Sequence, residues 1–309
     1  MSSAMPKEIR YLYMAAAGNV LIGIVGISVF MVSESEAILL DGLFNLTYAV
    51  TGLFAVRIAW LLSLGDSAEW PLGYNFFEPL VNGVKGMLVL GVSVMALIGS
   101  VEALIAGGRN IDAGMAVSYG VFASAVCWGM AWFVHRGAKA TDSPLLIADA
   151  ENWLVNAAIS SCVLLAFGGI FLLKALELEH LTPYVDPLVV LIVVLLSISV
   201  PVRMAWNALM SLLNRAPNQA TMEAVTASID TVLNEVPLQS RFVRMIQPGR
   251  QRLVGVYLVF EPNQANMGLA EQDALRQKIH DKLTGEYPAT TVDVIFTQDK
   301  QWAEHTGIT

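Results

Sequence analysis

The chain has 309 residues, of which 55% are hydrophobic and 14% are charged, and its mean hydropathy is +0.59. Soluble domains carry about 25% charged residues, so this composition predicts a polytopic membrane protein with a smaller soluble part. The formal net charge of −8 argues against a nucleic-acid partner. The two cysteines, Cys127 and Cys162, lie inside apolar stretches, so neither a disulfide framework nor a thiolate metal site is expected.

Six apolar segments are long enough to cross a bilayer, which takes about 20 residues of helix. The first follows a polar N-terminal segment and is 22 residues long, which is too long for the core of a signal peptide, so we expect it to be retained as a helix. Pro201 interrupts the sixth segment and predicts a kink there. In chain order the segments are Tyr11–Val32, Ala37–Leu64, Pro79–Ala106, Ala113–Val134, Ser143–Leu173 and Tyr184–Leu213.

The charges of the connecting segments predict the orientation of the helices. The region before the first span and the loop between the fourth and fifth are basic, with Lys7, Arg10, Arg136 and Lys139. The loops expected on the other side are mainly acidic, although the loop between the second and third spans is acidic too. Basic loops stay in the cytoplasm, so we expect both termini there and the protein in the cell inner (plasma) membrane.

After residue 214 the composition becomes that of a soluble domain, which predicts a transmembrane domain, residues 1–214, and a cytoplasmic domain, residues 215–309. The predicted fold class is an α-helical membrane protein with six transmembrane helices and a small α+β (α-β-β-α-β) cytoplasmic domain. The elements expected in that domain are a helix at Met222–Val236, strands at Phe242–Ile246 and Leu253–Phe260, a helix at Leu269–Leu283 and a strand at Thr291–Thr297.

Two pairs of polar residues lie inside the apolar spans with helical spacing. Asp41 and Asn45 are four residues apart in the second span, and Asn152 and Asn156 are four apart in the fifth. Residues four apart share one face of a helix, and a carboxylate in a membrane helix usually faces the protein interior or a wet cavity. One such Asn alone could simply be a packing contact between helices, but the two matched pairs together predict a site for a small cation.

Four stretches of the sequence resemble the cation diffusion facilitator family, and the resemblance covers nearly the whole chain. They are DGLFNL from Asp41, PLGYNFFEPL from Pro71, ADAENWLVNA from Ala148, and YVDPLVV, which leads into SLLNRAP. Members of this family are homodimers that export divalent metals, usually in exchange for protons. The resemblance implies a homodimer with paired cytoplasmic domains and a transport site between the second and fifth helices, at the two polar pairs.

The implied site departs from that of zinc-transporting relatives, which place Asp and His on these helices. Here Asp41 is joined by three carboxamides, those of Asn45, Asn152 and Asn156. Zinc prefers Cys, His and carboxylate ligands, whereas an amide oxygen is a hard donor that suits Mg²⁺, Ca²⁺ or Mn²⁺. We therefore expect transport of a hard, divalent cation such as Mn²⁺ or Mg²⁺ rather than zinc, and no resident cofactor.

Three further ionisable residues are auxiliary candidates for the site. Asp149 lies three residues before Asn152, on roughly the same helix face, and could add charge. Lys85 lies about two turns into the third span, where an ammonium group either snorkels to the surface or pairs with Glu78 or a membrane carboxylate. If Lys85 met Asp41, it would stand in for a bound cation.

The cytoplasmic domain lacks the histidines that bind metal in zinc-transporting relatives. Asp299 is retained, whereas His280 and His305 do not fit the pattern of those relatives. We therefore expect no metal in this domain, and a dimer that rests on packing of the apolar strand LVGVYLVF and neighbouring surfaces. The other aligned positions are Arg241, Tyr257, Glu271 and Thr297.

Three functions are compatible with these residues. The first is a transporter that exports a divalent cation by alternating access, with Asp41 also carrying the exchanged proton. The second is a transporter of a monovalent or organic cation, because one carboxylate with carboxamides matches a single positive charge. The third is a non-transporting paralogue that acts as a subunit. We do not expect an enzyme, because the sequence shows no nucleophile–base pair, phosphate loop or HExxH motif.

Overall fold

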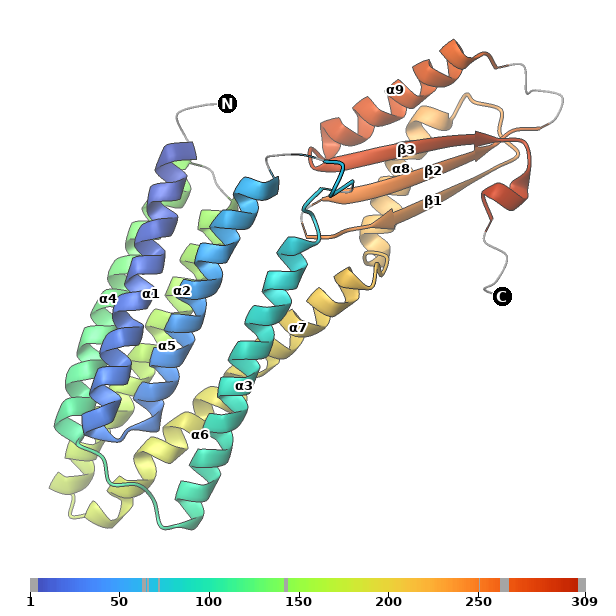
Figure 1. Ribbon diagram of the computed structural model, residues 1–309. Coiled ribbons are helices and arrows are strands. Elements are labelled where there is room, and N and C mark those ends of the chain that lie inside the picture. Colours follow the sequence, from blue (N-terminus) through green and yellow to red (C-terminus); the bar gives the residue numbers. More distant parts are fainter. Residues whose placement is uncertain are drawn as a thin grey trace. The chain divides into compact units, whose positions relative to one another are not determined.

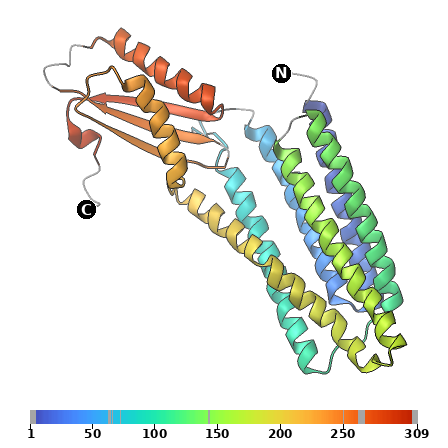
Figure 2. The same ribbon diagram turned by 180° about the vertical axis from the view of Figure 1, so that it is seen from behind.

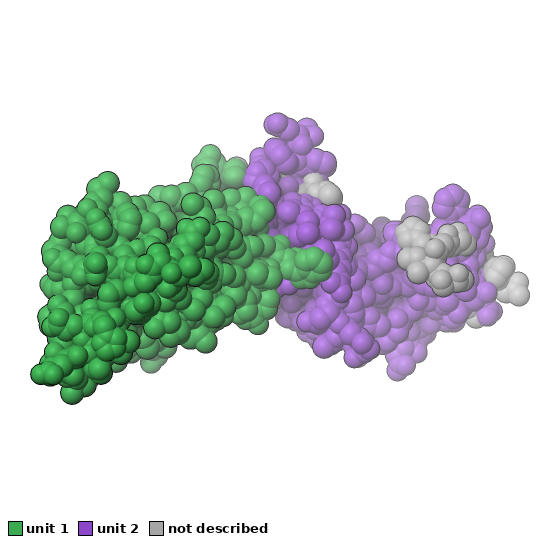
Figure 3. Space-filling view, turned by 90° about the horizontal axis from the view of Figure 1, so that it is seen from below, with its two compact units in different colours: residues 1–64, 81–206 green, residues 65–80, 207–309 purple. Residues whose placement is uncertain are grey.

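The computed structural model of the chain describes residues 5–62, 65, 67–71, 73–141, 144–249, 251–261 and 267–304. The chain divides into two compact units, which Figure 3 shows in different colours. Unit 1 consists of Met1–Leu64 and Val81–Trp206, and unit 2 consists of Gly65–Leu80 and Asn207–Thr309. Unit 2 therefore combines the segment between the second and third helices with the C-terminal part. The boundary after residue 214 stays a prediction.

Unit 1 is built from long apolar helices (Figure 1). Six helical segments of the described chain are long and apolar enough to cross a membrane, which confirms the predicted number of spans. Several of these helices extend beyond the apolar stretches, because a helix can continue into polar residues at its ends. The helices are α1 (Met5–Ser33), α2 (Glu36–Leu62), α3 (Phe77–Ile105), α4 (Ala113–Thr141), α5 (Pro144–Ala175), η1 (Glu179–Tyr184), α6 (Val185–Ser197) and α7 (Ser199–Leu212).

The sixth span is divided into two helices just before Pro201. α6 ends at Ser197 and α7 begins at Ser199, with Ile198 between them. Proline has no N–H to donate to the carbonyl four residues earlier, here that of Ser197, and its ring crowds that carbonyl. The helix is therefore interrupted where the sequence predicts it to be.

Small residues bring α1 and α2 into close contact. A Cβ on Gly42 would lie 3.3 Å from the carbonyl oxygen of Gly23, and a Cβ on Gly26 would lie 3.0 Å from the Cα of Gly42. Residues without a side chain let membrane helices approach closely. α1 also packs on α4, α4 packs on α5, and α6 contacts both α2 and α5 (Figure 1, Figure 2). The α2 helix, which carries Asp41, is thereby held between α1 and α6.

A buried carboxylate joins three parts of unit 1 where α2 begins. Asp186, in the first turn of α6, accepts a hydrogen bond from the Ser35 hydroxyl at 2.5 Å. It also accepts hydrogen bonds from the backbone N–H groups of Glu36 and Ala37, at 3.2 and 3.3 Å. Arg109, between α3 and α4, pairs with Asp186 at 3.3 Å and with Glu36 at 2.6 Å. This paired and hydrogen-bonded carboxylate fixes the first turn of α2 against α6.

Unit 2 contains the α-β-β-α-β order that the sequence predicts. Its strands form one sheet in the order β1-β2-β3, with β1 antiparallel and β3 parallel to β2. Parallel neighbours require a crossover connection, and α9 provides it. The helices α8 and α9 lie beside each other against the sheet (Figure 2). The elements are α8 (Gln219–Leu233), β1 (Ser240–Ile246), β2 (Arg252–Val259), α9 (Leu269–Glu286), β3 (Thr290–Thr297) and η3 (Lys300–Trp302).

The core of unit 2 is apolar and follows the period of each element. The helices bury residues three or four positions apart, and β2 buries residues two positions apart, so one face of each element supplies the core. These positions are Val225, Ile229 and Leu233 of α8, Leu275, Ile279 and Leu283 of α9, and Val254, Val256 and Leu258 of β2.

Candidate cation-binding site

A cavity of about 410 Å³ lies among the helices of unit 1, and each helix from α1 to α7 lines part of it. Its volume is within the range of small-molecule pockets, about 300–1,000 Å³, and is larger than a bare ion needs. Apolar side chains form most of the wall. The polar residues that line it are Asn19, Asp41, Tyr48, Thr51, Asn82, Lys85, Tyr119, Asp149, Asn152, Asn156, Ser160 and Ser197.

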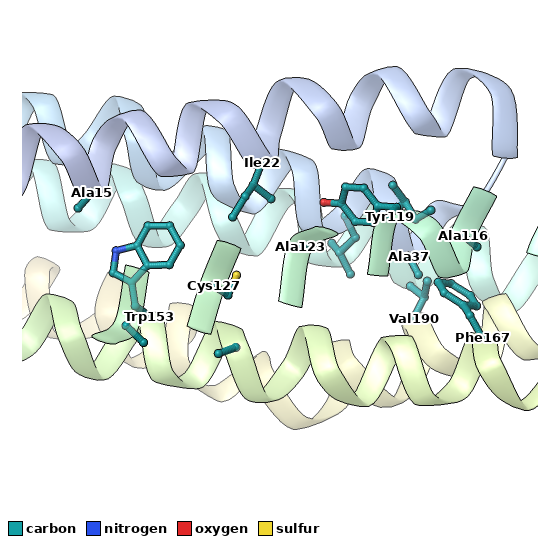
Figure 4. Close-up of a cluster of buried hydrophobic side chains, with 14 of the residues drawn as sticks. Ala15, Ile22, Ala37, Ala116, Tyr119, Ala123, Cys127, Trp153, Phe167 and Val190 are labelled. Atoms are coloured by element: carbon teal, nitrogen blue, oxygen red, sulfur yellow. The ribbon is translucent and has the colours of Figure 1, made fainter. Parts of the chain in front are cut away.

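Asp41 is held in the cavity wall by two neutral hydrogen-bond donors. The Tyr119 hydroxyl donates to Asp41 Oδ2 at 2.6 Å, from α4. The Asn45 amide donates to Asp41 Oδ1 at 3.2 Å and to the Asp41 carbonyl at 2.8 Å. Gly26 of α1 leaves room for this contact, since a Cβ there would lie 2.9 Å from the Tyr119 hydroxyl oxygen. Figure 4 shows Tyr119, with its oxygen in red, among the buried side chains of this region.

Asn45 lies behind Asp41 and is not among the residues that line the cavity. It is buried, and its amide oxygen has no hydrogen-bond partner among the described residues. Although Asp41 and Asn45 share a helix face as predicted, Asn45 turns its amide N–H₂ back towards Asp41. In this conformation Asn45 positions the carboxylate instead of facing the cavity.

The two asparagines of α5 face the same cavity as Asp41. Asn152 and Asn156 both line it, one helical turn apart. The structure thus brings three of the four predicted residues, Asp41, Asn152 and Asn156, to one cavity. Whether they bind a cation there stays a prediction.

Two further residues of this site were not identified from the sequence. Tyr119 lies in a span that shows no charge, so nothing local marks it as a partner of Asp41. Asn19 of α1 lines the cavity, is buried, and has an amide oxygen without a hydrogen-bond partner among the described residues. An asparagine in an apolar span was the signal available for Asn19, but it lacks a second polar residue at helical spacing.

Of the three auxiliary candidates, two face the cavity. Lys85 lines it with Nζ 4.5 Å from the ring centroid of Tyr48, and Asp149 lines it from α5. Lys85 and Asp149 interact electrostatically. Glu78 belongs to unit 2, where its carboxylate lies beside Gly249, so close that a Cβ on Gly249 would be 2.5 Å from Oε2. The membrane carboxylate with which Lys85 interacts is therefore Asp149.

The oxygen donors that line the cavity belong to two carboxylates, four carboxamides and two phenols, besides hydroxyl groups. These are Asp41 and Asp149, then Asn19, Asn82, Asn152 and Asn156, then Tyr48 and Tyr119. In the described part of the chain no three His, Cys, Asp or Glu side chains are grouped as a metal site. Amide, phenol and carboxylate oxygens can hold a hard cation, while the thiolate and imidazole ligands that zinc favours are missing from the described lining.

In unit 2, positions aligned with metal ligands of relatives make local structural contacts. Arg241 pairs with Asp230 of α8 at 2.5 Å. The Arg244 guanidinium lies over the ring of Tyr257, 4.3 Å from its centroid. Glu271 accepts a hydrogen bond from the backbone N–H that precedes α9. Whether this unit binds a metal stays a prediction.

Six membrane-length helices around a cavity with several polar side chains are typical of a polytopic membrane protein of the transporter class. The family model described as the cation efflux transmembrane domain matches residues 12–213, well over half of the chain. The chain therefore belongs to the cation efflux, or cation diffusion facilitator, family, as the resemblance in sequence indicated, and it is a cation transporter of that family. A comparison with curated proteins finds no match.

Proposed function

We propose that this protein exports a cation through the cavity of unit 1 by alternating access, in exchange for protons, with Asp41 as the charged ligand. One observation carries the proposal. Asp41 lies in the wall of a polar cavity in a chain of the cation efflux family, and its described hydrogen-bond donors are neutral. Its charge is thus available to an arriving cation or proton.

The surrounding side chains would complete the coordination of the cation. Asn152 and Asn156 on α5 and Asn19 on α1 line the same cavity, so their amide oxygens can replace water around the ion. A cation and a proton compete for the same carboxylate, since each needs its negative charge. Alternate exposure of the cavity to the two sides of the membrane would couple this competition to transport.

The assembly and orientation are part of the proposal. The resemblance in sequence implies a homodimer, and the basic loops favour both termini in the cytoplasm, with the protein in the inner membrane. Its partners would be a second copy of the chain, the lipid bilayer, the transported cation and protons. The oxygen donors of the cavity favour a hard cation over zinc.

The test is flux in proteoliposomes that contain a pH-sensitive dye, for a panel of monovalent and divalent cations. Asp41→Asn keeps the shape of the side chain and an acceptor for Tyr119 but removes the charge. We expect cation and proton flux to fall by at least about tenfold, since even groups behind metal ligands are worth about 10–100-fold in affinity. Asp112→Asn, at an exposed residue before α4, is the matched control and should transport normally.

The folding of both variants is checked by size-exclusion chromatography and thermal unfolding in detergent. An Asp41→Asn variant that folds and carries as much cation and as many protons as the wild type would show that the transport site lies elsewhere. A wild-type protein without flux of any cation on the panel would favour a non-transporting subunit.

A further inference from the structure

Lys85 places a positive charge inside the cavity. Its Nζ lies 4.5 Å from the centroid of the Tyr48 ring, and an ammonium over an aromatic face is attracted to it. The next residue, Gly86, allows close contact between α3 and α7, because a Cβ there would lie 2.8 Å from the backbone nitrogen of Ala205. α3 approaches α7 at this point, and the side chain of the preceding residue, Lys85, lines the cavity.

Asp149 faces the same cavity and interacts electrostatically with Lys85. Together the two contribute no net charge, and a proton passing from one to the other leaves that sum unchanged. Among the described residues that line the cavity, the remaining carboxyl group is that of Asp41, which is counted here in its ionised form. The formal charge of this described lining is therefore −1.

We propose that Lys85 makes the transporter selective for monovalent cations. The proposal rests on the proposed function, since it takes the Asp41 cavity as the transport site. A monovalent cation leaves the occupied cavity neutral. A divalent cation leaves it with one excess positive charge, which the low-dielectric interior of a membrane protein stabilises poorly.

The charge of Lys85 changes the preference that the amino-acid sequence alone suggests. An expectation of Mn²⁺ or Mg²⁺ follows from oxygen donors alone, and those same donors also suit an alkali cation or a small organic ammonium ion. Lys85 in the cavity wall offsets the charge of Asp149, so the described lining offers a divalent ion one net negative charge in place of two. The charge balance therefore selects the monovalent class from the cations that the donors accept.

The experiment measures the ratio of monovalent to divalent flux in proteoliposomes of the full chain. The probes are Na⁺, K⁺ and choline on one side of the comparison, and Mg²⁺, Mn²⁺ and Zn²⁺ on the other. The variants are Lys85→Gln, Asp149→Asn and the double variant Lys85→Gln/Asp149→Asn. Lys174→Gln is the matched control, because Lys174 is exposed near the end of α5 and does not line the cavity.

We expect the wild type and Lys174→Gln to carry at least one of the monovalent probes in preference to every divalent one. Lys85→Gln brings the formal charge of the described lining to −2, so the ratio should shift towards divalent cations by about tenfold or more at an effective dielectric constant of about 20. The double variant restores −1 and should restore the monovalent preference. Asp149→Asn alone removes the net charge and should weaken the flux of all cations.

Thermal unfolding of the purified protein with each cation gives a second readout, because a ligand that binds the folded state raises Tm. This measurement remains informative for a variant whose transport is too slow to measure. Lys85→Arg, which keeps the charge and the ring contact, should retain wild-type selectivity.

A wild type that carries and is stabilised by divalent cations alone would overturn the proposal, as would an unchanged ratio in Lys85→Gln. If that divalent flux is lost in Asp41→Asn, the proposed function still stands and the monovalent selectivity alone is wrong.

Discussion

The two units of this chain bury different kinds of side chain. Unit 1 holds carboxylates among its apolar helices: Asp186 is buried where α2 begins, and Asp41 and Asp149 are half-buried in the cavity wall. In unit 2 the charged groups described here lie at the surface or are partly exposed, and the core is aliphatic and aromatic. A buried carboxylate costs free energy unless it is hydrogen-bonded or paired, so its presence in a membrane helix marks either a structural clamp or a functional group.

Within unit 1, Asp186 and Asp41 differ in the charge of their hydrogen-bond partners, and this difference separates the two roles. Asp186 pairs with Arg109, which it shares with Glu36, and accepts hydrogen bonds from the first turn of α2. Asp41 receives donors from Tyr119 and Asn45, which are neutral. The paired carboxylate is therefore structural, whereas the carboxylate with neutral donors is the one that a mobile cation can neutralise.

The largest effect is expected from breaking the structural carboxylate. Asp186→Ala leaves the Ser35 hydroxyl and two backbone N–H groups without their acceptor and removes one of the two carboxylates that pair with Arg109. Breaking a buried pair costs about 3–5 kcal/mol. We expect thermal unfolding of the full-length protein in detergent to show a large fall in Tm, or loss of the folded protein.

Asp112→Ala is the control for this prediction. Asp112 accepts a hydrogen bond from the backbone N–H of Met115 at the start of α4, but it is exposed. Loss of such a helix cap costs about 0.5–2 kcal/mol. Equal falls in Tm for the two variants would show that the buried pair has no special role.

An apolar substitution in unit 2 should have a somewhat smaller effect. Ile279 of α9 is fully buried, and truncation of such a residue to alanine costs about 2–5 kcal/mol through lost burial and the cavity left behind. Urea unfolding of residues 215–309, which contain this whole apolar core, measures the change. Leu269→Ala, on a side chain that is 79% exposed in the same helix, should stay within about 0.5 kcal/mol of the wild type. A similar cost for both would contradict the assigned core.

The parts of this molecule that could be predicted from its sequence depend on local patterns. The six spans follow from apolar runs, and the order α-β-β-α-β follows from periods of 3.6 and 2 residues. Both signals are contained in about 20 consecutive residues. Both signals can therefore be recognised in the sequence without knowing which elements pack together.

The contacts that complete the candidate site depend on tertiary packing. Tyr119 meets Asp41 across 78 residues of sequence, and Gly26 of a third helix makes room for it. Helical spacing correctly placed Asn45 on the same face as Asp41, but it could not show that Asn45 would donate back to Asp41. The sequence left open whether Lys85 snorkels to the surface or pairs with a carboxylate. In the structure α3 approaches α7 at Gly86, and the Lys85 side chain lines the cavity.

The smallest effect is expected at the surface contact between α8 and α9 in unit 2. Glu286 pairs with Lys282 at 2.8 Å and accepts a hydrogen bond from the Ser228 hydroxyl of α8 at 2.5 Å. The hydrogen bonds from Lys282 and Ser228 hold the pKa of Glu286 below its ordinary value of 4.5. Because the folded state then binds its proton less readily than the unfolded state, stability rises with pH across this range.

The stabilisation by Glu286 should therefore be present above pH 4.5 and be lost as the pH falls through the lower folded-state pKa. Glu286→Gln removes the charge, so its stability should be below that of the wild type at neutral pH and equal to it in acid. Urea unfolding of residues 215–309 at a series of pH values measures this, and salt should reduce the difference because the pair is exposed. Glu304→Gln is the variant for comparison, because it removes another exposed ion pair, that of Glu304 with Lys300 at 3.1 Å. A stability difference for Glu286→Gln that stays constant with pH would mean that the contact between the two helices does not depend on the charge of Glu286.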